Sequence, residues 1–520
     1  MASRTTSAIS FGNPKGDRAR RLEDEAPMRI LVLGNFGACI DEGRQEETTP
    51  TRYRARFVDV DNIDDVLCAL APSIELTFTE GGESVLRLNF RTMEDFHPDE
   101  LYRRLPFFNR LRELRRRLLD PDTFDSAAAE LRNEQAALPK APSGEGQGEG
   151  RQPPSPMSAE DDASTFKRLL GSDVSVPIDS KTVMLNDTES LIRSLVAPHI
   201  ISESPHLQLY LDAVDDAAAT LMRAILGNPA FRRLESAWRS LAWLVTSLET
   251  DESLQVALLD VSKETLRREL SDFSGGPLDS DFFRQVFEVE GGLPDGQGWS
   301  LMVGDYGFDA GESDAALLAA LGTIGSAAVA PFVSHAEPTV VGSPGFAFSS
   351  DPTDWIPLGA GDREAWRGLR ESASARWVCL ALPRILLRLP YGADTEPCDS
   401  FAFDEMHKAR DHEAYLWGNP GFAIAIVLGR AFRQAGWNLL SRMSSDLEDL
   451  PAHVYLGEDG ETLMQACAEA YLTERAGQAI LEKGCVPVLS YRHRNAVRLG
   501  PLRTLFSQSV LVEDLLAKRR

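Results

Sequence analysis

Apolar runs of strand length alternate along this chain with longer segments of helical periodicity. A β-branched run at 28–33 ends at Gly34, which is typical of a buried strand. Alternating stretches at 74–78 and 85–90 flank a Glu-Gly-Gly-Glu turn and predict a hairpin. Similar patterns predict further strands at 254–261, 299–303, 376–382 and 486–491.

Apolar residues three and four positions apart predict amphipathic helices between these strands. One such pattern begins at His97-Pro98, where Pro106 is expected to kink the helix or start a second one. Helices are also predicted at 207–226, 231–248, 314–328, 422–432 and 461–483. Strand and helix in this rhythm predict a mixed α/β (α+β) fold, with two sheet-containing domains joined by a disordered linker.

The linker is recognised by its composition. Residues 139–163 are rich in Pro, Gly, Ser and Glu, a mixture that buries too little apolar surface to order itself. As a random coil, about 25 residues reach roughly 25–30 Å. This reach permits the N-terminal domain to dock either on its own chain or on a neighbouring one.

Charge and cysteine usage narrow the class of protein. The formal net charge is −25, and phosphate backbones need a basic surface, so nucleic acid is excluded as a general partner. The six cysteines are scattered without a Cys-x-x-Cys pair, which indicates a reduced, cytoplasmic protein. Neither a signal sequence nor an apolar run of about 20 residues is visible, so membrane insertion is not expected.

Three sequence patterns are candidates for phosphate binding, zinc binding or acid–base catalysis. The loop 34–37, Gly-Asn-Phe-Gly, lacks the Gly-Lys-Ser/Thr ending of a phosphate loop. His407 and His412 are five apart, whereas zinc-binding pairs on a helix lie three or four apart. Asp404 and Glu405 are adjacent and diverge on a helix. We therefore predict no catalytic residue, cofactor or metal, and a soluble enzyme with an unrecognised site remains an alternative.

The most distinctive stretch is 382–423, which reads LPRILLRLPYGADTEPCDSFAFDEMHKARDHEAYLWGNPGFA. Arginine among Leu and Ile indicates either a paired guanidinium or a side chain whose stem is buried while its charged end reaches water. For the paired case, Glu405 is the predicted partner of Arg384 or Arg388. The structural candidates here are Arg384, Arg388, Glu405, Trp417 and Asn419.

Two further regions supply interface candidates. The helical region 98–118 is rich in arginine, including Arg103, Arg115 and Arg116. Such a run marks either a solvated helix face or a surface that docks on acidic groups of the same or a neighbouring chain. Near the N-terminus, Ile9 and Phe11 lie in a short apolar patch, which is read as a flexible tail or a strand that pairs with another sheet.

These motifs resemble two known families. The LPR-x-x-x-RLPYG and YLWGNP segments, with LLDVSK and GDYGF, resemble the large subunit of the type VI secretion contractile sheath. The segments VDVDNIDDVLCAL and LRLNFRTMEDFHPDELYRRL resemble the small subunit of the same sheath. The two subunits are ordinarily separate chains, so the resemblance implies a fusion.

The resemblance implies this organisation: N-terminal arm 1–27, small-subunit domain 28–138, linker 139–163, helical connector 164–204 and large-subunit domain 205–520. It implies a structural subunit, assembling by strand pairing between subunits around an inner tube. The large-subunit family continues beyond the point where this sequence stops, so a shortened C-terminus is expected.

Partners follow from the same resemblance. They are other sheath subunits, the inner tube protein and the baseplate, with an AAA+ recycling unfoldase engaging 166–170. The shortened end raises an alternative role as a cap, a baseplate-proximal subunit or a regulatory paralogue that joins a sheath without propagating it.

Overall fold

The computed structural model describes residues 26–37, 53–78, 84–136, 207–271, 276–289, 298–406, 410–441, 443–457 and 459–517. The expected arm with Ile9 and Phe11, the linker 139–163, the connector 164–204 and His407 lie outside the described residues. The chain forms two compact units. Unit 1 contains the chain up to Val66, Ser236–Arg388 and Trp417 onward; unit 2 contains Leu67–Glu235 and Leu389–Leu416.

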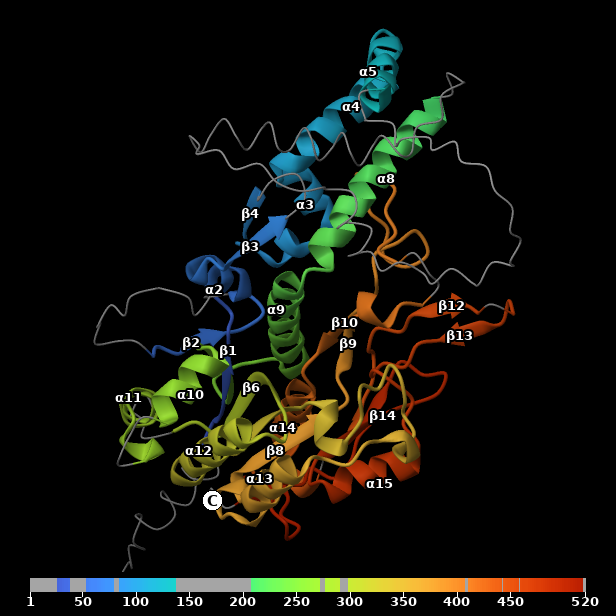
Figure 1. Ribbon diagram of the computed structural model, residues 1–520. Helices are drawn as coiled ribbons and strands as arrows, with labels where there is room; N and C mark the ends of the chain where they lie inside the picture. The colour runs from blue at the N-terminus through green and yellow to red at the C-terminus, as the bar shows by residue number, and fades with distance from the viewer. Residues whose placement is uncertain are drawn as a thin grey trace, which may run out of the picture. The chain divides into compact units, whose positions relative to one another are not determined.

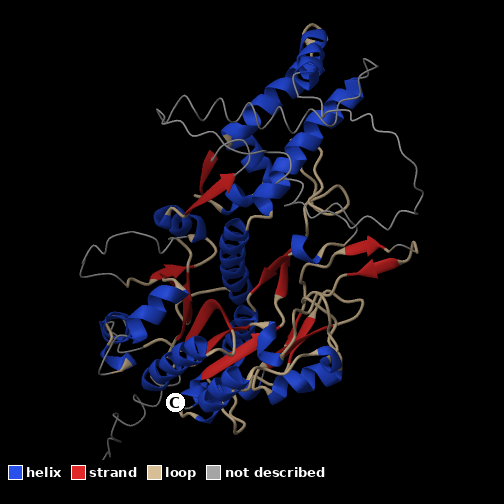
Figure 2. Cartoon of the chain, viewed as in Figure 1, coloured by secondary structure: helices blue, strands red, loops and turns tan. Residues whose placement is uncertain are grey.

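Unit 1 is built on a nine-stranded sheet in the order β11-β15-β14-β8-β7-β6-β1-β5-β2 (Figures 1 and 2). The strands are β1 (Met28–Gly34), β2 (Arg56–Val58), β5 (Leu254–Asp260), β6 (Leu301–Phe308), β7 (Phe332–Ala336), β8 (Val378–Leu382), β11 (Asp446–Leu447), β14 (Val486–Ser490) and β15 (Val497–Leu499). The six strands from β14 to β5 run parallel, whereas β2, β15 and β11 join antiparallel.

Strand β1 lies inside this sheet, between β5 and β6. It pairs with β5 from Met28↔Leu254 to Gly34↔Asp260 and with β6 from Ile30↔Leu301 to Leu33↔Gly304. All seven residues of β1 are buried, which confirms the strand predicted from the apolar run. A strand covered on both faces favours apolar residues at most positions, as in parallel sheets. The exception here is Arg29, which is buried and whose Nε donates to Gln255 Oε1 at 2.9 Å.

Helices cover both faces of the sheet. They are α9 (Pro229–Leu248), α10 (Lys263–Ser271), α11 (Asp281–Phe283), α12 (Glu312–Ala328), α13 (Ala360–Glu371), α14 (Pro420–Ala435), α15 (Glu474–Glu482) and α16 (Val512–Leu516). Leu31 and Leu33 share a core with α10, α12 and α13. Helix α14 packs on β6, β7 and β8, and Gly429 lets it approach Leu248 of α9 closely.

Unit 2 combines a hairpin with helices. Its elements are α2 (Ile63–Leu70), β3 (Ser73–Phe78), β4 (Ser84–Asn89), α3 (Pro98–Arg104), α4 (Asn109–Leu119), α5 (Phe124–Ala136) and α8 (Leu207–Leu226). Phe90 stacks on Phe96 with ring centres 4.4 Å apart, and Phe231, at the start of α9, contacts both. As predicted, Pro106 separates two helices: α3 ends at Arg104, with Leu105 as its C-cap, and Pro106 starts the next helical turn.

The mixed α/β class is confirmed, but one predicted helix is wrong. Instead of a helix at 461–483, β13 (Thr462–Met464) pairs with β12 (Val454–Leu456), and α15 starts only at Glu474. The Thr473 hydroxyl accepts a hydrogen bond from the amide of Ala476 and so fixes the helix start. A further two-stranded sheet joins β9 (Ile385–Arg388) and β10 (Leu416–Gly418).

Candidate functional site

The strand order places a topological switch point at β1. β5 lies on one side of β1, whereas β6, β7, β8 and β14 follow in chain order on the other. In open α/β sheets, ligands bind at the carboxyl ends of the strands beside such a point. The loop 35–37 after β1 and the end of β6 are therefore the first places to examine for a site.

Protein side chains fill the crevice beside β1. Phe36 is fully buried and packs edge-on against Trp238 of α9, with ring centres 5.3 Å apart. The indole Nε1 of Trp238 donates to the carbonyl of Phe36 at 3.1 Å. A Cβ on Gly34 would lie 2.6 Å from the Phe36 ring, so this glycine is what lets the ring turn inward.

A carboxylate takes the place that an anion would need in this loop. The amide of Gly37 donates to Asp260 Oδ1 at 2.9 Å. Burial raises the pKa of Asp260, and hydrogen bonds from the Gly37 and Phe36 amides partly oppose that rise. Phosphate loops bind through free amides of this kind. The amides of Phe36 and Gly37 are thus already bonded to the carboxylate of Asp260 at the end of β5.

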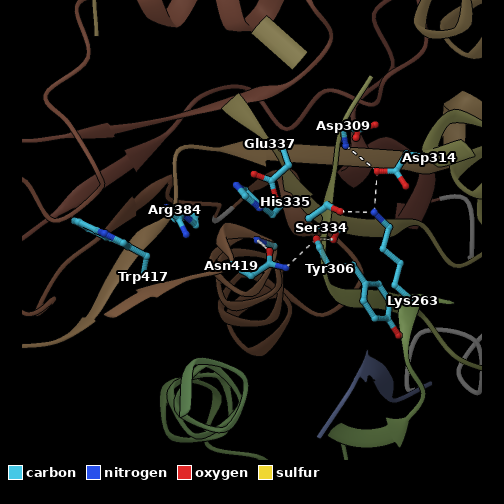
Figure 3. Close-up of polar contacts among 12 residues, drawn as sticks. Lys263, Tyr306, Asp309, Asp314, Ser334, His335, Glu337, Arg384, Trp417 and Asn419 are labelled. Carbon is cyan, nitrogen blue, oxygen red and sulfur yellow. Dashed lines mark hydrogen bonds and ion pairs between the residues drawn. The ribbon is translucent and has the colours of Figure 1, made fainter. Parts of the chain in front are cut away.

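The end of β6 carries the polar cluster drawn in Figure 3. The β6–β7 register shifts between Val303 and Gly307, so carbonyls there leave the regular ladder. The Ser334 hydroxyl lies 2.6 Å from the Gly304 carbonyl, and Asn419 Nδ2 donates to the same oxygen at 2.8 Å. These two side chains donate hydrogen bonds to buried carbonyls that lie outside the regular ladder at the register shift.

Asn419 has a second role as the N-cap of α14. Its Oδ1 accepts from the amide of Gly421 at 2.8 Å. A Cβ on Gly421 would lie 2.9 Å from the Cα of Ser334, so glycine allows the helix to start against β7. The Asn-Pro-Gly sequence thus joins α14 to β6 and β7.

Asp305 of β6 lies beside the connection of α14 to β6 and β7. Burial of its carboxyl raises its pKa to about 6, and a hydrogen bond from Asn419 works in the opposite direction. The group is therefore only partly ionised near pH 6.

An ion-pair group links the β6 end to α10 and α12. Lys263 Nζ donates to the Gly307 carbonyl at 2.6 Å and to Asp314 Oδ2 at 2.7 Å. Arg267 Nη2 donates to the other oxygen of Asp314 at 2.9 Å, and the amide of Asp309 also bonds this carboxylate. Asp314 is buried with all its acceptors used, so the group positions the helices.

His335, at the end of β7, is neutral at physiological pH. Burial is the main cause that lowers its pKa to about 3; the positive charges of Arg384 and Lys263 also lower it, and the carboxylate of Glu469 opposes them. Its Nδ1 lies 3.8 Å from Glu337 Oε1, whose carboxyl pKa burial raises. A neutral imidazole beside a carboxyl that resists ionisation makes a weak pair.

Arg384 has a partner that the sequence did not indicate. Its Nη2 donates to Glu469 Oε1 at 2.6 Å, and its amide donates to Glu469 Oε2 at 3.0 Å. Glu469 is almost fully buried, and its own amide donates to the Arg384 carbonyl at 3.1 Å. Sequence reasoning missed Glu469 because 85 residues separate it from Arg384.

The other candidates of 382–423 are buried. Arg388 ends β9, and Glu405 exchanges two hydrogen bonds with the backbone of Tyr391 at 2.8 and 2.9 Å. The Trp417 carbonyl accepts from the Ser236 hydroxyl at 2.9 Å. The pairing of Arg388 with Glu405 stays a prediction. Lys263, Asp314 and Ser334 were missed because neither spacing nor residue type sets them apart.

The arginines of unit 2 divide into two kinds. Arg115 on α4 bonds Asp215 of α8 at 2.9 and 3.4 Å. Arg116 instead pairs with Glu113 one turn earlier, and Arg103 pairs with Glu100 in the same way. Both of the latter side chains are largely exposed, so they form a solvated helix face, while Arg115 joins two helices.

The hairpin β12–β13 is the most open strand pair of unit 1. Val454 and Leu456 alternate on one face with exposed fractions of 55% and 64%. Each of the two strands has one paired neighbour among the described residues. Exposed apolar positions next to unpaired backbone edges are a template for pairing with another chain.

In the ranges that the structure describes, no group of three or more His, Cys, Asp or Glu side chains is arranged to hold a metal ion. Across those same ranges, every helix is too short or too polar to cross a membrane.

Comparisons with known proteins agree with the motifs. Residues 209–501, more than half of the chain, match the family described as EvpB/VC_A0108, tail sheath N-terminal domain. Residues 9–136 match the family described as Type VI secretion system, VipA, VC_A0107 or Hcp2. The type VI secretion system sheath protein TssC1 of Pseudomonas aeruginosa is 34% identical over 317 residues, covering 60% of this chain and 61% of TssC1.

Proposed function

We propose a structural role for this chain from the premise that it belongs to the tail sheath family of the type VI secretion system. In this role the chain is a sheath subunit that carries the small and the large part in one polypeptide. It assembles with further sheath subunits around an inner tube by pairing strands across chains. Its working cycle is a change of packing between subunits, with no covalent chemistry in the chain itself.

One observation carries the proposal. β1 comes from the segment that matches the small-subunit family, yet it lies between β5 and β6 of the segment that matches the large-subunit family. The two matched segments therefore share one hydrophobic core, which suits a single protomer better than two loosely tethered modules.

The open hairpin β12–β13 supports assembly by strand pairing. Its exposed Val454 and Leu456 can be covered by a strand from another chain, and residues 8–12 are our candidate for that donated strand. The inner tube, the baseplate and an AAA+ unfoldase acting on 166–170 are further proposed partners, in the cytoplasm.

The packed loop after β1 argues against an enzyme. The carboxylate of Asp260 and the ring of Phe36 fill the position that nucleotides occupy in related sheet topologies. We therefore favour a structural protein over catalysis.

Negative-stain electron microscopy of the purified chain, alone and with the separate sheath subunits of the same cell, tests the proposal. Tubes formed by the chain alone, or mixed tubes that contain it, are the expected result. Soluble chains that shorten partner tubes would instead support the capping or regulatory role. No interaction in either sample would overturn sheath assembly and reopen the search for an enzyme site.

A Leu456→Asp variant sharpens this experiment. A charge on the hairpin face opposes strand pairing without touching the core, so tubes should become fewer while the subunit stays folded. Glu448→Lys on an exposed side chain elsewhere in unit 1 is the matched control and should leave tubes intact. Equal tube formation by both variants would remove the hairpin from the proposal.

A further inference from the structure

An apolar groove of about 430 Å³ lies in unit 1, apart from the strand ends described above. It is lined by Val427 of α14, Leu481 of α15, and Pro487 and Leu489 of β14, among others. Its volume is typical of pockets that take one or two large side chains or a small ligand.

Gly477 keeps the groove open. A Cβ at this position would meet Leu489 at 3.4 Å and Pro487 at 3.8 Å, which is ordinary van der Waals contact. A side chain could therefore grow from residue 477 into the groove. At the edge, Arg498 bonds Asp446 at 2.9 Å, whereas Glu474 has no ion-pair partner among the described residues.

The N-terminal part of the chain enters unit 1 near this groove. The indole Nε1 of Trp437 donates to the carbonyl of Ala26 at 2.9 Å. Trp437 follows directly on α14, the helix that also supplies Val427 to the groove. Twenty-five residues precede Ala26 in the sequence, and they include the apolar patch Ala-Ile-Ser-Phe-Gly at 8–12.

We propose that residues 8–12 of the same chain bind in this groove, with Ile9 and Phe11 as anchors. In an extended segment these two side chains point to the same side, about 6.6 Å apart. The 15 residues from Phe11 to Ala26 span up to about 50 Å, whereas α14 measures about 24 Å. The arm therefore reaches the groove of its own chain.

The apolar patch and the reach of the arm favour this occupant. The charges that follow the patch balance, since four bases stand beside four acids: Lys15, Arg18, Arg20 and Arg21, with Asp17, Glu23, Asp24 and Glu25. Anchoring therefore rests on the two apolar side chains. The bound arm is a resting state of the free chain, so this inference holds whether or not the chain forms a sheath.

Photocrosslinking of the full chain tests the inference. Benzoylphenylalanine in place of Phe11 should, on irradiation at low protein concentration, attach within the same chain to groove residues such as Leu481 or Leu489. Mass spectrometry locates the attachment. Ile9→Ser in the same chain removes one anchor outside the folded core and should lower the yield about tenfold.

Filling the groove gives the matched comparison. Gly477→Met should block the attachment, whereas Gly368→Met, on a helix with open space around the residue, should leave it unchanged. Attachment elsewhere in unit 1, attachment only between two chains, or an unchanged yield with Ile9→Ser would each overturn the inference. Sheath assembly is not measured in this experiment, so its failure is separate from failure of the proposed function.

Discussion

Strand β1 and the hairpin β12–β13 are both short and mainly apolar, but they differ in their neighbouring strands and in the burial of their side chains. β1 has a parallel neighbour along each edge and a buried side chain at every position. In the part of the chain that the structure describes, β12 pairs with β13 alone, and Val454 and Leu456 are exposed. The difference shows that apolar composition makes a strand, but the neighbours decide whether it holds a fold together or remains available to another chain.

The two elements should also differ in whether they contribute to folding or to association with other chains. β1 joins the segment matched by the small-subunit family to the core of the large one, so its side chains should control folding. The hairpin contributes little buried surface, so its side chains should control association.

A charge in β1 should unfold unit 1. Val32→Asp buries a carboxylate without a partner on a covered face of the sheet, which costs about 4 kcal/mol or more. Val454→Asp in the hairpin should change the free energy of unfolding by no more than about 0.5 kcal/mol. Denaturant titration followed by circular dichroism measures both. A folded Val32→Asp chain of normal stability would contradict the central position of β1.

Asn419→Ala tests the connection of α14 to β6 and β7. The variant loses the donor to the Gly304 carbonyl and the N-cap of α14, so we expect a loss of about 2–4 kcal/mol. Asn438→Ala, on an exposed residue just after the same helix, is the control and should be neutral. Similar losses in the two variants would mean that the bulge carbonyls do not depend on Asn419.

The Arg384–Glu469 pair can be tested by a double-mutant cycle. Arg384→Met leaves the buried Glu469 carboxylate without its guanidinium, and we expect a loss of about 2 kcal/mol because Arg384 itself is part exposed. Adding Glu469→Gln should recover part of this loss. Strictly additive losses would show that the two side chains act independently.

Asp305→Asn tests the effect of pH on the connection of α14 to β6 and β7. The pKa of Asp305 rises from 3.8 to about 6 on folding, so the folded chain holds this proton more tightly than the unfolded chain. Its contribution to stability is full below pH 3.8 and is lost as pH rises through 6. The variant should therefore gain stability relative to the parent at pH 7.5 but not at pH 4. An equal difference at both pH values would refute the shift.

The smallest effects are expected on α4. Arg115→Ala removes a part-buried bond to Asp215 on another helix and should cost about 1 kcal/mol. Arg116→Ala removes an exposed pair within one helix and should cost less than about 0.5 kcal/mol. Thermal unfolding of the two variants ranks them, and a larger loss for Arg116 would reverse our assignment of the arginines.

Local patterns in the sequence determined most elements of the fold. The helix at 207–226 has the bounds of α8, and the run 28–33 is β1, because periodicity and terminating Gly or Pro residues act on neighbouring positions. The prediction of a helix at 461–483 is wrong in its first half, because β13 lies there and pairs with β12. The helix starts only after its N-cap, Thr473. Motifs along 382–423 indicated the family, but not that Arg384 pairs with Glu469.

What only the tertiary structure decided is the place of β1 and the state of the loop after it. The sequence alone left open whether the N-terminal part docks on its own chain, because a linker of about 25 residues permits either arrangement. Seven residue pairs between β1 and β5 place β1 in the nine-stranded sheet of the same chain. The same sheet brings Asp260 to Gly37 and Trp238 to Phe36, and these contacts between residues more than 200 positions apart close the crevice. Long-range pairing of this kind depends on the packing of the whole sheet, which no local pattern encodes.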